Sequence, residues 1–280
     1  MTTTLRPTGP ERTDGSGSRE RAYAICVNGR AAGTVTVTAW PDGVGQIADL
    51  FVEERGRGRG RGTTAVLAAE EILRAWGCSR AEGTIVGDER DPEVAARLLR
   101  WTQSLGYALT ARNMVKDLPV TPPELPPGLT GRPLTAEEFP VWAAAHREGY
   151  VGILIEHTGL SPEQAEAKSL ADHAKLLPDG IDTADVSIQR LLADGASVGT
   201  VWVSSADSEA RPPFVYNVRV EEAFRGRGHG RALMLLAEQV VIAAGRDRLG
   251  LNVHAGNVPA ERLYESLGYR TYRWAVAKQL

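Results

Sequence analysis

The pattern of apolar and polar positions predicts the same succession of elements twice along the chain. Residues 46–52 and residues 214–220 are short, β-branched apolar runs, which predict strands. A glycine-rich segment follows each run, and a helical pattern follows each glycine-rich segment. In the second half the helical spacing is carried by Ala232, Leu235, Leu236, Gln239 and Ala243, and Gly245 stands where such a helix would end. The repeating unit is therefore strand, glycine-rich loop and helix.

The neighbouring segments extend this unit in both directions. Residues 22–39 and residues 186–205 each predict two strands joined by a tight turn, the second at Asp194-Gly195. Residues 249–253 predict a further strand, residues 259–267 a helix, and the chain closes with a terminal strand. Only the second half has a helical region before its hairpin, over residues 135–177.

The repeat is also visible in residue identities. Residues 50–72 align without gaps with residues 218–240 at a constant offset of 168, from Arg57 to Arg225. Near the end of each half the sequence Ser-Leu-Gly-Tyr recurs at 104–107 and 266–269, an offset of 162 from Gly106 to Gly268. A shared period of this length means that one domain has been duplicated.

Composition divides the chain into four segments. Residues 1–20 combine Thr, Gly, Ser, Pro and charge without a hydrophobic period, so we expect a disordered tail. Six prolines lie between positions 118 and 133, and we expect residues 119–133 to form a stiff, extended linker. The two copies then occupy residues 21–118 and 134–280, a division that suits a chain of 280 residues.

Charge and composition narrow the function classes. The net charge is -3, with 32 Lys and Arg against 35 Asp and Glu, which gives no reason to expect nucleic acid or an anionic membrane as partner. No apolar run approaches the ~20 residues of a membrane-spanning helix. Two cysteines form no disulfide framework, so we expect a reducing cytoplasm, and five histidines without a ligand cluster predict no metal site.

The glycine-rich loops predict an anion site. Each reads Arg-x-x-Gly-x-Gly between a strand and a helix, and unpaired N–H groups of a first helical turn point at an anion there. Glycine lets the anion approach the backbone closely. The loops lack the Lys-Ser/Thr of a nucleotide P-loop, and they do not follow the G-x-G-x-x-G pattern either.

The second copy resembles the GNAT superfamily, the acetyl-coenzyme A-dependent N-acetyltransferases. Residues 225–230, preceded by the strand with Val218 and Val220, look like the pyrophosphate loop of that family. Residues 257–269 follow its second motif residue by residue, so that the resemblance spans about 214–269. The whole chain is similar to tandem GNAT proteins.

The resemblance implies an α/β fold of two GNAT-like domains, each with a mixed, mostly antiparallel central sheet flanked by helices, the first copy being truncated. The fourth and fifth strands would splay apart, and acetyl-CoA would lie in the gap as acyl donor, with no metal. The implied cofactor-binding residues are Val218, Arg219, Val220, Arg225, Gly226, Arg227, Gly228, His229, Gly230, Arg231 and Asn257. Residues 150–158 would form a loop on one wall of the acceptor pocket.

The resemblance also implies a catalytic role for Tyr264, as the acid that protonates the departing thiolate. A phenol with an unperturbed pKa of ~10 carries its proton at neutral pH and can act in this way. The resemblance does not identify the residue that acts as base and takes the proton from the amine. Asn217 and Asn252 occupy the strand positions of interest and cannot serve, which leaves His254, Glu221 and Glu156 as candidates.

The first copy keeps the loop but loses the second motif. Its possible second cofactor loop consists of Arg57, Gly58, Arg59, Gly60, Arg61 and Gly62. At the offset of 162, however, Thr102 stands for Tyr264 and Ala95 for Asn257. We therefore expect the first copy to hold CoA or nothing and not to catalyse.

The remaining aromatic residues and histidines have ordinary interpretations. We expect His146, His157 and His173 to be solvated, and Trp142, Trp202 and Trp274 to be core residues. The function expected is transfer of an acetyl group to a primary amine of a small molecule or peptide, by direct attack of the amine in the second copy. We expect a monomer or homodimer. A CoA-binding sensor without acceptor chemistry is the alternative, and RNA binding through the Arg/Gly loops is a third.

Overall fold

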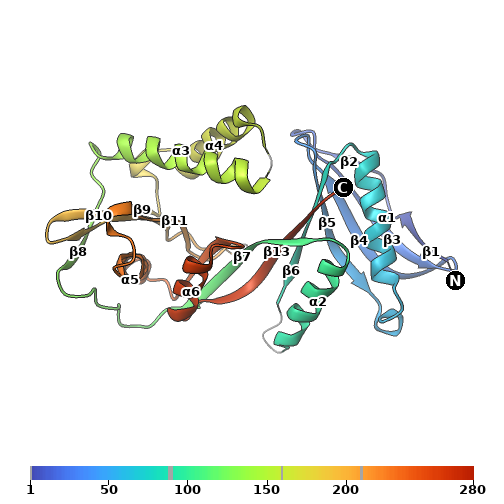
Figure 1. Cartoon of the computed structure of the whole chain (residues 1–280). Coiled ribbons are helices and arrows are strands. Elements are labelled where there is room, and N and C mark those ends of the chain that lie inside the picture. Colours follow the sequence, from blue (N-terminus) through green and yellow to red (C-terminus); the bar gives the residue numbers. More distant parts are fainter. Residues whose placement is uncertain (1, 88–90, 159, 209–210) are drawn as a thin grey trace. The chain divides into compact units, whose positions relative to one another are not determined.

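The computed structural model describes residues 2–87, 91–158, 160–208 and 211–280 (Figure 1). The chain forms two compact units. The first contains residues Met1–Arg112 and Tyr272–Leu280, and the second contains Asn113–Thr271. The predicted α/β fold of two copies is confirmed.

The first unit is a mixed sheet with the strand order β1-β3-β4-β5-β6-β13. Its strands are β1 (Thr3–Pro7), β3 (Arg19–Val27), β4 (Arg30–Ala39), β5 (Val44–Val52), β6 (Arg80–Val86) and β13 (Arg270–Gln279), and a short β2 (Arg12–Thr13) pairs with β3. The helices are η1 (Glu54–Gly56), α1 (Arg61–Ala75) and α2 (Pro92–Ser104). Alternation along β4 turns Val35 and Val37 inward, where they pack with Ala69 and Leu73 of α1.

The second unit has the strand order β7-β12-β11-β10-β9-β8. The strands are β7 (Ala108–Asp117, of which 113–117 lie in this unit), β8 (Leu129–Pro133), β9 (Val186–Ala193), β10 (Ala196–Ser204), β11 (Phe214–Val220) and β12 (Arg248–His254). The helices are α3 (Phe139–Thr158), α4 (Pro162–Leu176), η2 (Gly180–Asp182), η3 (Glu222–Phe224), α5 (His229–Ala243) and α6 (Val258–Ser266).

Helices cover both faces of the second sheet (Figure 1). Successive side chains of β10 point to opposite faces. Val201 and Val203 are fully buried in the core that contains α5. Trp202, between them, packs instead with Trp142 of α3. The pair α3–α4 therefore covers the face opposite α5, and no such helix pair precedes β3 within the described part of the first unit.

Local chemistry accounts for the turns and helix starts. The β3–β4 and β9–β10 hairpins turn at Asn28-Gly29 and Asp194-Gly195, where all four residues have positive φ, the backbone that such two-residue turns demand. Ser161 caps α4 through a reciprocal pair of hydrogen bonds with Gln164.

Three segments differ from the expectation. Within the expected disordered tail, residues 3–7 form β1, because their backbone completes the edge of the sheet beside β3 from Thr3↔Val27 to Pro7↔Tyr23. The last five residues of the expected linker form β8. Of the linker's six prolines only Pro133 follows Gly128, so the backbone of this segment can pair with β9. The terminal strand β13 joins the first unit, where it runs antiparallel to β6 from Arg273↔Val86 to Gln279↔Arg80.

Candidate active site

Two parallel strands of the second unit separate and open the sheet. β11 and β12 pair only at Phe214↔Gly250 and Val215↔Leu251, so their following residues lie on the two sides of a gap. In the first unit the parallel pairing of β5 with β6 ends at Ile47↔Gly83. These residues lie 168 positions before Val215 and Leu251, so both copies splay at the same point.

A cavity of about 940 Å³ occupies the gap in the second unit. Both splayed strands, the helices α3, α4 and α6, and Trp202 of β10 line it. Its lining residues from β11, β12 and the α6 region are Phe214, Val215, Tyr216, Asn217, Val218, Arg219, Leu251, Asn252, Val253, His254, Asn257, Ala260 and Tyr264. Of the predicted cofactor residues, Val218, Arg219 and Asn257 thus meet Tyr264 in one cavity.

Tyr264 stands on α6 with its ring against the main core of the unit. Burial raises the pKa of Tyr264 to about 12, so its hydroxyl keeps its proton at neutral pH. The helix itself is started by Asn257, whose side-chain oxygen accepts from the N–H of Ala260 at 3.3 Å. Asn257 therefore orients the helix that carries Tyr264, in addition to lining the cavity.

The glycine-rich loop leads into α5 beside this cavity's strand β11. Gly226 and Gly228 have φ of 75° and 82°, and Gly58 and Gly60 of the first copy have 69° and 71°. A Cβ at any of these four positions would meet no atom within 4 Å, so the space above the loop is open. The first backbone hydrogen bond of α5 runs from the N–H of Ala232 to the carbonyl oxygen of Gly228. The N–H groups that precede Ala232 in this first turn can therefore bind an anion.

The loop does not line the cavity. Residues 225–231 and Val220 are absent from the cavity walls. Of the predicted cofactor residues, Val218 and Arg219 on the strand line the cavity, whereas those of the glycine-rich loop that follows the strand do not. Arg225 reaches back to the carbonyl of Val220 at 3.5 Å, and Arg57 makes the equivalent bond to Val52 at 3.0 Å. Arg231 donates to the Ser266 hydroxyl at 2.6 Å. Arg225 and Arg231 thus hold the glycine-rich loop of the second copy in place through hydrogen bonds, and Arg57 does so in the first copy.

Two histidines expected to be solvated lie instead in a hydrogen-bonded pair. His146 of α3 places Nδ1 3.0 Å from Nε2 of His173 on α4, and His173 Nδ1 lies 3.0 Å from the carbonyl oxygen of Ser169. Burial lowers the pKa of His146 to about 4, with further lowering from His173 and Arg219. Burial also lowers the pKa of His173. The side chain of His157 lies outside the described residues.

An aromatic cluster surrounds His146. Its ring stacks on Trp142 at 5.2 Å between centroids and meets Trp202 edge-on at 5.2 Å. Trp202 in turn contacts Tyr216 at 4.8 Å. Trp142 and Trp202 are core residues as expected, but both also line the cavity. The indole N–H of Trp202 is buried without a hydrogen-bond partner among the described residues.

A sequence signal for this cluster exists on α3. Trp142, His146 and Tyr150 recur at intervals of four, which places them on one helix face. All three line the cavity, together with Ile153 and Leu154. The wall expected as a loop over residues 150–158 is thus the last part of a helix, because the apolar run continues the helical period of α3.

Charged groups also face this side of the cavity. Tyr150 donates to Asp172 at 2.9 Å, and Lys168 lies 3.2 Å from the same carboxylate. Burial raises the pKa of Tyr150, with a further contribution from Asp172. Arg219 of β11 approaches the Ala145 carbonyl at 3.5 Å. Among the described residues, the charged and titratable groups that line the cavity together with His146 on this side are His173, Tyr150, Asp172, Lys168, Glu148 and Arg219.

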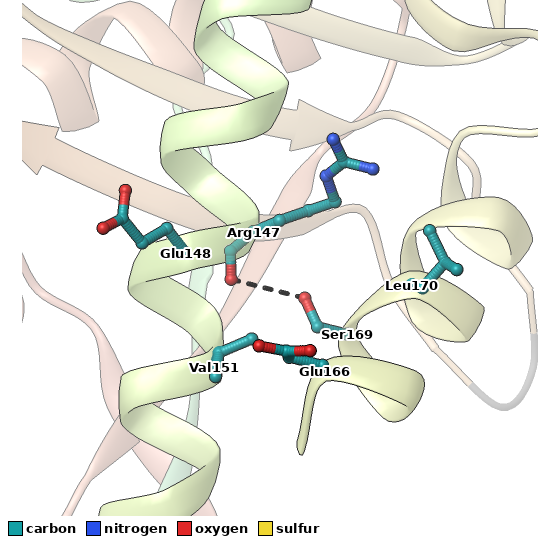
Figure 2. A pocket seen from close by; sticks show the side chains of 6 residues that line it. All are labelled: Arg147, Glu148, Val151, Glu166, Ser169 and Leu170. Carbon is teal, nitrogen blue, oxygen red and sulfur yellow. Dashed lines mark hydrogen bonds between the residues drawn. The ribbon is translucent and has the colours of Figure 1, made fainter. Parts of the chain in front are cut away.

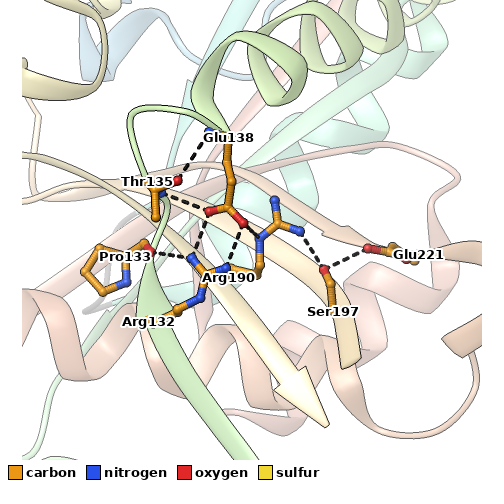
Figure 3. A network of polar contacts seen from close by, with 7 residues as sticks. All are labelled: Arg132, Pro133, Thr135, Glu138, Arg190, Ser197 and Glu221. Atoms are coloured by element: carbon orange, nitrogen blue, oxygen red, sulfur yellow. Dashed lines mark hydrogen bonds and ion pairs between the residues drawn. The ribbon is translucent and has the colours of Figure 1, made fainter. Parts of the chain in front are cut away.

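The three candidates for the general base that the sequence left open differ in whether they line the cavity. His254 lines the cavity, as do Asn217 and Asn252, whereas Glu221 and Glu156 do not. Figure 3 shows why Glu221 has another role: its carboxylate accepts from the Ser197 hydroxyl at 2.9 Å, and Ser197 accepts from Arg190.

The same network ties the start of α3 to the sheet (Figure 3). Arg132 donates to both carboxylate oxygens of Glu138 at 2.8 and 2.7 Å, and Arg190 lies 3.3 Å from that carboxylate. The hydrogen bond from Arg132 holds the pKa of Glu138 at about 2, with a further contribution from the N–H of Thr135. This network fixes the helix that carries His146.

A second, smaller cavity of about 370 Å³ lies between α3 and α4. Figure 2 shows Ser169 donating to the backbone oxygen of Arg147 across it, at 3.4 Å. Val151 and Leu170 give the groove apolar walls, and Glu148 and Glu166 border it. The Ser169 bond joins the two helices close to the His146–His173 contact.

The first copy lacks the groups that serve the cavity in the second. Thr102 is buried, and its hydroxyl donates to the Leu99 carbonyl of its own helix at 3.0 Å. Ala95 is likewise buried. Thr102 therefore offers no free hydroxyl, and Ala95 offers no polar side chain.

Comparison with known proteins agrees with this geometry. The model of the "Acetyltransferase (GNAT) family" matches residues 4–96 and 153–269. A mycothiol acetyltransferase from Frankia casuarinae is 30% identical, over 94% of this chain and 77% of its own length. An uncharacterized N-acetyltransferase from Bacillus subtilis is 26% identical over 53% of this chain and 96% of its own.

Solved structures share the fold. A GCN5-related N-acetyltransferase from Sphaerobacter thermophilus superposes with a TM-score of 0.57 at 21% identity, covering 92% of this chain and 80% of that one. A tandem GNAT protein from the clavulanic acid biosynthesis pathway gives a TM-score of 0.51 at 17% identity, with coverage of 95% and 85%.

The chain belongs to the GNAT family of acetyltransferases, in tandem form, and it is an acyltransferase. Within the described residues, no helix combines the length and apolar character that crossing a membrane requires. The same part of the chain contains no group of three or more His, Cys, Asp or Glu side chains placed to hold a metal ion.

Proposed function

We propose that the second unit transfers the acetyl group of acetyl-CoA to an amine bound in the 940 Å³ cavity. The observation that carries this proposal is that the gap between β11 and β12 and the Tyr264 side chain share that one cavity. The family of the chain supports acetyl-CoA as donor. The open space above Gly226 and Gly228 suits a pyrophosphate on the loop, so the residues present fit this donor.

Three groups of residues in the second unit have separate roles in binding acetyl-CoA and in the reaction. The N–H groups of residues 226–231 bind the pyrophosphate at the start of α5. Val218 and Arg219 present their strand edge, unpaired with β12, to the pantetheine. Tyr264 holds a proton near the sulfur and gives it up when the C–S bond breaks, because burial keeps its phenol protonated until then.

The cavity suggests an acceptor with an apolar or aromatic portion beside its amine. Trp142, Trp202, Tyr216 and Ile153 supply the apolar wall. The mycothiol acetyltransferases among the relatives make mycothiol-related amines the first acceptors to test. The first unit binds CoA or nothing and does not catalyse, since Thr102 cannot replace the phenol.

The test is a calorimetric titration of the full chain with acetyl-CoA, followed by a thiol-release assay over a panel of amines. The panel contains mycothiol-related amines, phenethylamine, spermidine, lysine amide and glucosamine. Saturable binding and thiol release with at least one amine support the proposal. Binding without release for every amine favours a CoA sensor instead, for which the lack of a carboxylate at Asn217 and Asn252 is the supporting observation.

A further inference from the structure

The chain of hydrogen bonds from Ser169 through His173 to His146 fixes where each histidine carries its proton. The Ser169 carbonyl can only accept, so His173 Nδ1, 3.0 Å away, donates to it. A neutral His173 then has a lone pair on Nε2, and His146 Nδ1, 3.0 Å away, donates to that lone pair. His146 is thus left with an unprotonated Nε2, a tautomer assigned from the network.

That nitrogen has no protein partner among the residues that the structure describes, and His146 lines the same cavity as Tyr264. The ring is held by stacking on Trp142 and by the edge contact with Trp202, so it cannot turn away from the cavity without breaking both contacts. The Arg132–Glu138 network and the Ser169–Arg147 bond hold α3 and α4 in this arrangement.

We propose that His146 is the general base of the second unit, with His173 as the residue that positions it. This inference rests on the proposed acetyl transfer. The amine nitrogen bonds to the thioester carbonyl carbon, and its proton passes to His146 Nε2. The C–S bond breaks, its electron pair stays on sulfur, and Tyr264 gives sulfur a proton. The products are an amide and a thiol, and solvent afterwards returns the Tyr264 proton and removes the one on His146.

The environment favours the base form. Burial keeps His146 neutral at pH 7, with the lone pair available, and the nearby Arg219 acts in the same direction. The amine nitrogen becomes a far stronger acid once it has bonded to the carbonyl carbon, so a weakly basic imidazole can accept its proton at that stage. The second imidazole keeps the Nδ1 proton in place while Nε2 takes up a new one.

The test compares His146→Gln, His173→Leu and His173→Gln with the unaltered full chain, using the panel amine that gives the fastest thiol release. We expect His146→Gln to lower kcat by roughly 10²–10⁴-fold while acetyl-CoA affinity, measured by calorimetry, stays within twofold. His173→Leu removes the acceptor for His146 Nδ1 and should lower kcat as well. His173→Gln restores an acceptor oxygen near the Nε2 position and should recover most of the rate.

The outcomes separate the two proposals. If the unaltered chain releases no thiol with any amine, the proposed function fails and takes this inference with it. If the unaltered chain is active and His146→Gln keeps its kcat, only the inference is overturned. A large loss in His254→Asn with an unchanged His146→Gln would assign the base to His254. If His146→Gln fails to bind acetyl-CoA, the inference is tested by comparing kcat of His173→Leu with kcat of His173→Gln. A higher kcat in His173→Gln supports the inference, and equal kcat values overturn it.

Discussion

Lys116 donates to both carboxylate oxygens of Glu238, at 2.7 and 2.8 Å, across 122 residues of sequence. The first unit repeats the arrangement: Lys278 donates to Glu70 at 3.0 and 2.8 Å, across 208 residues. Each glutamate is fully buried on the helix that follows its glycine-rich loop, and each lysine comes from the other copy of the sequence. The two copies have therefore exchanged their last strands.

The buried pair predicts a strong dependence of stability on Lys116. Lys116→Met would leave the Glu238 carboxylate buried without its cation and should lower the free energy of unfolding by about 3–5 kcal/mol. Urea denaturation measures the loss. The double variant Lys116→Met with Glu238→Leu removes both charges and should recover most of it, whereas a loss below about 1 kcal/mol in the single variant would show that the pair is not structural.

The exchanged strand β13 predicts that the first unit depends on the end of the chain. Deletion of residues 272–280 would remove the antiparallel partner of β6 and the cation of Glu70. We expect backbone amides of β5 and β6 to lose their protection from hydrogen exchange. The variant Lys278→Met, which keeps the strand, separates the two contributions. Unchanged protection after the deletion would contradict the exchange.

Tyr264 predicts a separation of binding from turnover. Tyr264→Phe keeps the ring and removes the proton, so kcat should fall by roughly 10²–10⁴-fold with acetyl-CoA affinity nearly unchanged. Thr102→Val, at the equivalent position of the first copy, is the matched control and should leave kcat as it is. Thiol release and calorimetry check both variants, and an unaffected kcat in Tyr264→Phe would remove its role as acid.

The lowered pKa of His146 predicts acid sensitivity. The folded chain binds the His146 proton only near pH 4, whereas the unfolded chain binds it near pH 6.5. Between these values the unfolded state carries more protons, so stability rises with pH and is lost as pH falls from 6.5 to 4. The contribution lost is about 3 kcal/mol. Urea denaturation at a series of pH values should show this loss. His146→Gln should make the curve less steep over that window, with a remaining slope from His173, whose pKa burial also lowers. An unchanged curve would be inconsistent with a buried, neutral His146.

Local patterns sufficed to predict the repeated strand, loop and helix. The positive φ of Gly228 and Gly60 and the tight turns at Asn28-Gly29 and Asp194-Gly195 follow from the residues themselves. The strand exchange could not be predicted from the sequence. The segments with Lys116 and Lys278 have the same strand pattern of apolar and polar residues, and this pattern does not indicate which of the two sheets each segment joins. The His146–His173 contact depends on how α3 and α4 pack together, although the spacing of Trp142, His146 and Tyr150 marks the helix face involved.

The assignment of chemistry to the second copy is tested most directly by one pair of loop variants in the full chain. Gly228→Val and Gly60→Val place the same side chain at matched positive-φ positions, each in open space above its loop. The measurement is kcat/KM for acetyl-CoA in the thiol-release assay. We predict a loss of at least about tenfold for Gly228→Val, equivalent to ~1.4 kcal/mol, and less than about twofold for Gly60→Val. Equal losses, or a larger loss for Gly60→Val, would contradict the account.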